Sequence, residues 1–285
     1  MPWAWLRAPG SALGWLAGSV LRVRRGAVEE AMGRAGIDGP PREARAMYAA
    51  LGASALELFW LAGATPAARD RVLDARVVLD DALKAALAKG RVVIAASHTA
   101  NWELVAYGAA RFLEGHGRRL AVVVKPLSVG AFHAFCMRLR EACRLDLVAP
   151  EGALRAARRA LARGDVVAMP IDQVPDLERH GLRVPFLGAP ALADRAPAAL
   201  ARASGAPLIV VGARREGAAI TVHLVEEIAP GRDTEAATRA ATLALSRFVL
   251  AAPSSWLWLH RRWRLPRAAL DAARQMRDRS RRAAV

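Results

Sequence analysis

Short apolar runs rich in β-branched residues recur along the middle of the chain, with helical segments between them. Four runs are predicted as strands: 91–96, 120–125, 145–149 and 165–170. Two segments between the later runs have the composition and spacing of helices: 132–142 and 152–163. Strands that alternate with helices are typical of an α/β sheet with parallel strands. The centre of the chain therefore predicts such a sheet.

The pattern on either side of this region extends the same architecture. Further helices are predicted over 42–62, 65–90, 104–110 and 234–251. Residues 207–213 and 219–225 predict a β-hairpin around Arg215-Glu216-Gly217. We therefore predict an α/β fold with a mixed, largely parallel central sheet flanked by helices. Residues 26–285 are long enough to form one such domain, and 274–285 are predicted to be a charged, frayed tail.

The first 25 residues have a different pattern. They contain three tryptophans, Trp3, Trp5 and Trp15, and an uncharged run from Ala8 to Leu21 that is followed by Arg22, Arg24 and Arg25. The run holds 14 residues, whereas a membrane span needs about 20. Tryptophans with a basic flank favour a helix that lies in the membrane interface. We predict such a helix over 1–25; packing against the core is the alternative.

A histidine follows the first predicted strand directly, and a carboxylate lies five residues later. These are His98 and Glu103, in the segment Ser97-His98-Thr99-Ala100-Asn101-Trp102-Glu103. On one helix they would point about 140° apart, so they can meet only if His98 lies in the loop and Glu103 in the first turn. Asn101 is the predicted N-cap of that helix. A histidine with a carboxylate partner can deprotonate a hydroxyl; a histidine bonded to nearby backbone is the alternative.

A second polar residue follows a predicted strand in the same way. Asp172 comes directly after the run 165–170, so in a parallel sheet it opens on the same edge as His98. A turn or helix-cap aspartate is an equally good interpretation. Four further histidines, His116, His133, His180 and His223, show no metal-ligand spacing with one another, and no metal site is predicted.

Charge and cysteine content narrow the class of protein. The net charge is +16, but only three of the 42 basic residues are lysines, as expected from a GC-rich coding bias. No zinc-ligand cluster or aromatic RNA-binding motif accompanies the arginines. The charge therefore suits phosphate head groups, an anionic membrane or an acidic carrier protein better than nucleic acid. Cys136 and Cys143 are about 10 Å apart on one predicted helix, too far for a disulfide, which suits the cytoplasm.

Five short motifs follow one another along nearly the whole chain. They are His98-Thr-Ala-Asn-Trp-Glu103, Leu139-Arg140-Glu141, Ile171-Asp172-Gln173, Arg183-Val184-Pro185-Phe186-Leu187-Gly188 and His260-Arg261-Arg262-Trp263-Arg264. Taken in this order, they resemble the bacterial lipid A biosynthesis acyltransferases, which share an H-x4-D/E motif with glycerolipid acyltransferases. The chain departs from the family pattern at Leu187, where an aromatic residue is expected. It also lacks the Asn-Leu motif after the first arginine cluster.

The resemblance implies a membrane-associated O-acyltransferase on the cytoplasmic face of the inner membrane. His98 is the expected base and Glu103 its orienting carboxylate. Arg140, or backbone N–H groups near Gly188, would stabilise the oxyanion. Asn101, Asp172, Gln173, Arg183 and Phe186 are further expected substrate-binding residues. Acyl carrier protein is the implied donor, with acyl-CoA the alternative; a lipid A-type glycolipid is the acceptor, and no metal or redox cofactor is implied.

Two other functions remain compatible with the sequence. One is an acyltransferase of the same superfamily with a different phosphoglycolipid acceptor. The other is a basic membrane- or nucleic-acid-binding protein without chemistry, in which Arg261, Arg262, Arg264 and Arg267, with the surrounding tryptophans, form an anionic-ligand patch. Only an enzyme would show acyl transfer with a base that titrates near neutrality.

Overall fold

The computed structural model describes residues 2–125, 130–175, 177–229 and 231–263. The predicted frayed tail, Arg264 and Arg267 lie outside the described residues. Within the described ranges, the strands are β1 (Val77–Leu79), β2 (Val92–Ala96), β3 (Leu120–Val123), β4 (Asp146–Val148), β5 (Val166–Pro170), β6 (Gly181–Phe186), β7 (Ala189–Asp194), β8 (Leu208–Glu216) and β9 (Ala219–Ile228). The α-helices are α1 (Arg7–Trp15), α2 (Arg25–Arg34), α3 (Pro40–Gly63), α4 (Pro66–Arg76), α5 (Asp81–Ala88), α6 (Trp102–Glu114), α7 (Gly130–Ala142), α8 (Ala153–Ala162), α9 (Ala196–Ser204) and α10 (Thr234–Leu250).

Seven strands form one sheet in the order β1-β9-β8-β2-β5-β3-β4. Every neighbouring pair is parallel except β8 and β9, which form the predicted hairpin. The predicted α/β class with a mixed, largely parallel sheet is therefore confirmed. β6 and β7 pair only with each other, as a separate antiparallel hairpin that the sequence analysis did not predict.

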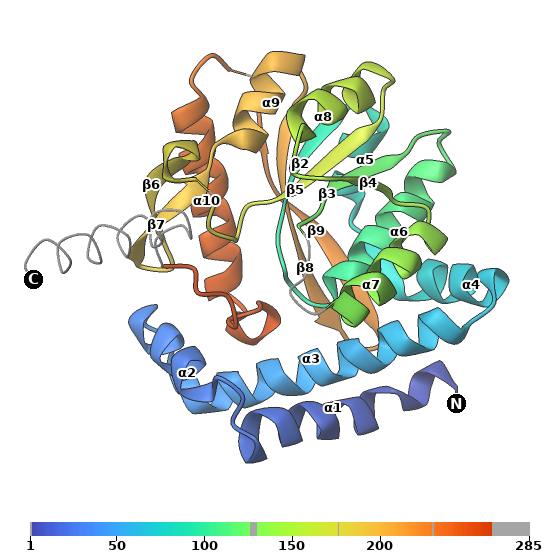
Figure 1. Ribbon diagram of the computed structural model, residues 1–285, viewed down its shortest axis with the longest axis vertical. Coiled ribbons are helices and arrows are strands. Elements are labelled where there is room, and N and C mark those ends of the chain that lie inside the picture. Colours follow the sequence, from blue (N-terminus) through green and yellow to red (C-terminus); the bar gives the residue numbers. More distant parts are fainter. Residues whose placement is uncertain (1, 126–129, 176, 230, 264–285) are drawn as a thin grey trace, which may run out of the picture.

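Helices cover both faces of the sheet (Figure 1). One apolar core contains residues of α4, α5, α6 and α7 together with Val92 and Ile94 of β2. The other contains residues of α8, α9 and α10 together with Val93 and Ala95 of the same strand. Alternate side chains of a strand point to opposite faces, so this continuous apolar run supplies both cores.

The predicted helix over 65–90 is wrong at its centre. The segment forms α4, the short strand β1 and α5, because Val77 and Val78 pair with β9 rather than continue the helix. Asp80 then starts α5 as its N-cap, accepting a hydrogen bond from the Leu83 backbone N–H. A β-branched pair followed by a capping aspartate was the local signal for this break.

The N-terminal segment forms α1 and a single π-helical turn, Leu16–Val20, and it packs along α3 (Figure 1). The two helices approach closely because glycines face each other. A Cβ atom at Gly14 would lie 1.9 Å from the Tyr48 carbonyl oxygen, and one at Gly52 would lie 2.2 Å from the Gly10 carbonyl oxygen. Small residues at such a crossing allow backbone-to-backbone packing.

Candidate active site

The His98 loop is placed by the register of the two central strands. β2 and β5 are parallel, with Ala96 paired to Pro170. His98 and Asp172 each lie two residues beyond these partners, so both side chains emerge at the same edge of the sheet. The sequence-predicted shared edge is therefore confirmed, and the two residues meet there.

The carboxylate that bonds His98 is that of Asp172. Its Oδ1 lies 2.9 Å from the imidazole Nδ1, and its Oδ2 accepts the His98 backbone N–H at 2.6 Å. The indole N–H of Trp256 donates to the same Oδ2 at 2.9 Å. Asp172 is fully buried, and these three bonds fix both its oxygens. A carboxylate on Nδ1 holds the proton there and leaves Nε2 as the basic nitrogen.

Electrostatics favour the charged state of this pair. Burial alone would lower the pKa of His98, but the Asp172 carboxylate, its hydrogen bond and the more distant Glu103 raise the pKa above its usual value. Burial opposes ionisation of Asp172, but the neighbouring His98 outweighs it and holds the pKa of that carboxyl well below its usual range. Asp172 is therefore ionised at neutral pH, as an orienting carboxylate must be.

Glu103 has a different set of partners from the one predicted. It lies in the first turn of α6, where it accepts two hydrogen bonds from the Arg140 guanidinium, at 2.5 and 3.0 Å, and one from the Tyr107 hydroxyl at 2.9 Å. The expected hydrogen bond between His98 and Glu103 is thus replaced by one to Asp172. Glu103 acts on His98 only through space, as a nearby negative charge.

Arg140 projects from α7 and is largely buried. Its Nε and Nη2 bind Glu103, while Nη1 is buried with no hydrogen-bond partner among the described residues. Arg140 lines the same cavity as His98. A buried guanidinium with an unused N–H can bind a carbonyl oxygen or an oxyanion in that cavity.

A cavity of about 380 Å³ extends from His98 between the sheet and the helices α5 and α6. Its polar lining includes His98, Glu103, Arg140 and Gln173, together with Ser97, Thr99, Lys125 and Asp194. The remaining wall is mostly aliphatic, with members such as Leu83, Leu87, Ile94, Ala109, Leu120 and Val211. A narrow apolar cavity with a few convergent polar groups at one end suits a fatty acyl chain with a reactive carboxyl derivative.

Gln173 and His260 complete the surroundings of the imidazole. The Gln173 amide nitrogen lies 3.4 Å from Nε2 of His98 and 3.4 Å from Nε2 of His260, and the two imidazole rings are 5.0 Å apart. Burial and the neighbouring positive His98 lower the pKa of His260 to about 4, so His260 is neutral at physiological pH. Sequence reasoning noted His260 only as part of a basic motif and did not predict its contact with His98.

Residues 252–263, which we call the C-terminal segment, hold the His98 loop (residues 97–100) in place. Thr99 pairs with Trp256 as an isolated β-bridge, the Leu257 backbone N–H donates to the His98 carbonyl at 3.1 Å, and the Ala100 backbone N–H donates to Ser255. Ala100 has a φ of 50°, a left-handed conformation that is uncommon for a residue with a side chain. Such strain persists only where surrounding contacts enforce it, and it is concentrated at functional sites.

The other predicted site residues lie away from the cavity wall. Asn101 is buried, and it caps α6 as predicted while donating to Glu57 at 2.9 Å. Arg183 is exposed and pairs with Glu178, and Gly188 forms the β6–β7 turn with a φ of 77°. Phe186 is buried against Trp256.

Arg262, the centre of the predicted basic motif, is a structural residue. It is 1% exposed, donates to the Leu192 carbonyl and lies over the Phe186 ring at 5.0 Å. Burial lowers its pKa to about 10. Arg262 therefore joins the C-terminal segment to the β6–β7 hairpin.

The fold and this geometry define a class: α/β proteins in which a carboxylate-bound histidine lies at the mouth of an apolar cavity. Comparison with known families agrees. The chain belongs to the family described as bacterial lipid A biosynthesis acyltransferase, whose profile matches residues 1–265. The protein is thus an acyltransferase of a family that is membrane-associated in bacteria and acts on lipid A-type substrates. A comparison with curated proteins gave no match.

Proposed function

We propose that the protein transfers a fatty acyl chain from a thioester, carried by acyl carrier protein, to a hydroxyl of a lipid A-type glycolipid. The observation that carries this proposal is the buried Asp172–His98 pair at the mouth of the apolar cavity. The thioester lies with its alkyl chain in the cavity. Each buried methylene contributes about 0.8 kcal/mol, so the aliphatic wall supplies much of the donor binding.

The proposed reaction uses one base and one oxyanion donor. The acceptor oxygen attacks the thioester carbon while His98 Nε2 takes the hydroxyl proton, and Asp172 stabilises the imidazolium. Arg140 Nη1 binds the developing oxyanion. Collapse of the tetrahedral intermediate expels the thiolate, which takes the proton back from His98. The Gln173 amide nitrogen donates toward Nε2 of His98. The acceptor hydroxyl is expected to take the same position relative to Nε2 when it donates its proton.

Acyl carrier protein is proposed as donor because it is acidic and the chain carries a net charge of +16. Charge complementarity of this kind speeds association and selects partners. Acyl-CoA presents the same thioester and is the comparison substrate. Comparing the two donors at low and at high salt separates recognition of the carrier protein from recognition of the thioester.

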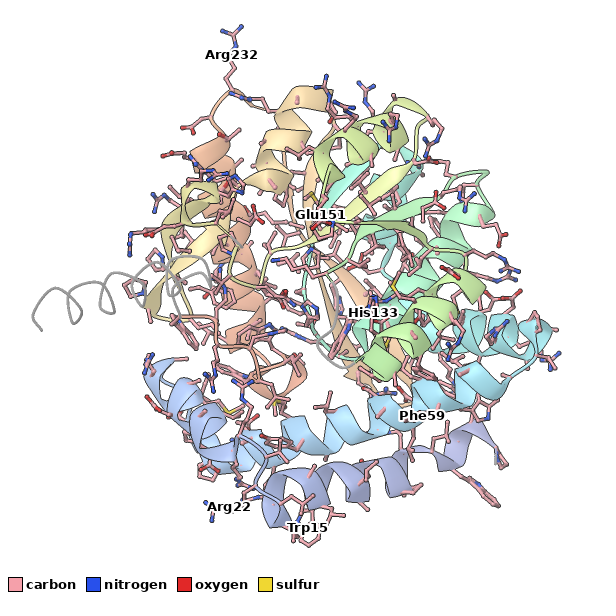
Figure 2. All side chains as sticks on the ribbon, in the orientation of Figure 1. Trp15, Arg22, Phe59, His133, Glu151 and Arg232 are labelled. Carbon is pink, nitrogen blue, oxygen red and sulfur yellow. The ribbon has the colours of Figure 1, made fainter. Side chains whose placement is uncertain are left out.

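We further propose that the N-terminal segment, residues 1–25, rests on the cytoplasmic face of the inner membrane. Trp5, Trp15 and Leu21 are 68%, 53% and 67% exposed, which is unusual for such large apolar side chains. Trp15 and the nearby Arg22 project outward from the same edge of the molecule (Figure 2). By length and composition alone, α3 could cross a membrane, and 39% of its most apolar window is buried in the fold.

The test of the activity uses the full chain with acyl carrier protein thioester and a lipid A-type acceptor, and mass spectrometry of the acceptor. His98→Ala is expected to lower the rate by about 10²–10⁴-fold. His116→Ala, in the exposed turn that follows α6, is the matched control and is expected to keep full activity. Transfer by His98→Ala at the control rate would refute the assignment.

The test of membrane binding uses the triple variant Trp5→Ser/Trp15→Ser/Leu21→Ser. It is expected to move the protein from vesicles into solution, whereas unchanged vesicle binding would contradict the role of the N-terminal segment.

A further inference from the structure

A second hollow, of about 320 Å³, lies on the α2 side of the molecule, where α2 faces the C-terminal segment. We call it the α2 groove; its polar wall contains Arg24, Arg34, His260 and Arg261, with Trp263 beside them. It shares no wall residue with the apolar cavity, and none of its wall residues takes part in the proposed reaction.

The charges of the α2 groove favour an anionic ligand. Arg34 pairs with the one acid of the wall, Glu30, at 2.8 Å. Arg24 and Arg261 are exposed, and neither has an ion-pair partner among the described residues. Arg24 is also held at a φ of 55°, a strained conformation for a residue with a side chain. Guanidinium groups with free N–H donors are well suited to phosphate.

An aromatic side chain flanks these arginines. The Trp263 indole N–H donates to the Phe186 carbonyl at 3.3 Å, and the Arg34 guanidinium lies 5.9 Å from the ring centroid. The hydrogen bond at its edge fixes the orientation of the ring. A fixed tryptophan in a wall that also contains arginines combines an apolar platform for the C–H face of a sugar with cations for its phosphates.

The α2 groove leads to the reacting nitrogen through a short polar chain. His260 belongs to the groove wall, its Nε2 lies 3.4 Å from the Gln173 amide nitrogen, and that amide lies 3.4 Å from Nε2 of His98. The imidazole rings of His98 and His260 are in edge contact, with centroids 5.0 Å apart. The groove wall thus lies one side chain away from His98, close enough for a ligand that reaches past His260 to present a hydroxyl to it.

We propose that the α2 groove binds the phosphorylated sugar head group of the acceptor, with Arg24 and Arg261 on a phosphate. This proposal rests on the proposed function, because it assigns the acceptor of that reaction. The two substrates then reach His98 from separate sites, as direct transfer without an acyl-enzyme requires.

The kinetic test uses Arg24→Gln, Arg261→Gln and the double variant. Each loses a hydrogen bond to a charged group, so KM for the phosphorylated acceptor rises about 10–100-fold while KM for the thioester is unchanged. With the dephosphorylated acceptor, the wild type already shows the higher KM and the variants add nothing. Arg158→Gln, an exposed change on α8 at the far end of the molecule, is the matched control (Figure 1). Equal losses with both acceptors, or the same loss in Arg158→Gln, would overturn the proposal.

A binding test separates failure of the α2 groove from failure of the reaction. A soluble phosphorylated glucosamine disaccharide is titrated into His98→Ala, which does not turn over, and tryptophan quenching is followed. Quenching that is lost in Arg24→Gln and in Trp263→Phe supports the groove even if no acyl transfer is found. If transfer is normal and neither arginine variant has an effect, the α2 groove does not bind the acceptor, but the proposed reaction is not contradicted. Loss of binding to phosphatidylglycerol vesicles, with KM for the acceptor unchanged, would assign the arginines to the membrane surface and also refute the proposal.

Discussion

Asp172 and Glu103 both approach the imidazole of His98, one from the end of β5 and the other from the first turn of α6. Asp172 forms hydrogen bonds with the His98 imidazole, the His98 backbone N–H and the Trp256 indole N–H. Glu103 instead binds Arg140 and Tyr107. Glu103, five residues from His98 in sequence, thus binds the Arg140 guanidinium. Asp172, 74 residues from His98, binds the imidazole of the proposed base. Strand register, rather than closeness along the chain, selects the partner of His98.

The largest loss of kcat is expected from a change at Asp172. Asp172→Asn keeps the shape of the side chain but lets the imidazole adopt the wrong tautomer, so kcat is expected to fall by about 10³–10⁴-fold. The kcat of Glu103→Gln should fall less, because this change leaves the Asp172–His98 hydrogen bond in place. Steady-state kinetics on variants with matched thermal unfolding midpoints decide the order. A smaller loss for Asp172→Asn than for Glu103→Gln would reverse the assignment.

The next effect concerns the Glu103–Arg140 pair. Arg140→Gln removes the proposed oxyanion donor, and the expected loss in kcat is about 10²–10³-fold. Glu103→Gln acts through Arg140, so the double variant Glu103→Gln/Arg140→Gln should be no slower than Arg140→Gln alone. Combined with Asp172→Asn, however, Arg140→Gln should add its full loss. Additive losses within the Glu103–Arg140 pair would show that Glu103 acts independently of the guanidinium.

A smaller effect is expected in the apolar cavity, away from both carboxylates. Ala109→Leu places a larger side chain in the cavity wall. Two or three methylenes of a long acyl chain lose their place, and at about 0.8 kcal/mol each this lowers kcat/KM for long donors by about 10–50-fold. The variant should use donors with shorter acyl chains as efficiently as the wild type does. A uniform loss for all chain lengths, measured with a series of thioesters, would mean that the cavity does not hold the acyl chain.

The smallest change expected is a shift in pH dependence. Transfer needs neutral His98, so kcat/KM rises with pH through the pKa of that residue, which Asp172 holds above the usual value. Removing the charge in Asp172→Asn lowers that pKa, and the acid limb of the profile moves to lower pH even though the rate has fallen. His260, with its pKa lowered to about 4, stays neutral and adds no limb near neutrality. A limb that does not move in Asp172→Asn would show that another group is being titrated.

The sequence predicted those features that depend on local pattern. The central strands and the β8–β9 hairpin were visible as β-branched runs, and Asn101 as a cap. β1 was missed because three residues between two helices give little periodicity to detect. The contact of Trp256 with Asp172 joins residues 84 positions apart, and no local pattern encodes such a pair. His260 was visible only as part of a tryptophan-rich basic motif, so its place beside His98 needed the three-dimensional arrangement.

The support that Trp256 and Leu257 give to the His98 loop has a consequence for how the protein is made. The ribosome releases β2, His98 and Asp172 long before residues 255–257, which supply the Ser255, Trp256 and Leu257 contacts. A nascent chain, or one cut short by premature termination, therefore lacks the bonds that hold the base and its carboxylate in register. Thioester cleavage should therefore begin only after residues 255–257 have been synthesised and have reached the His98 loop.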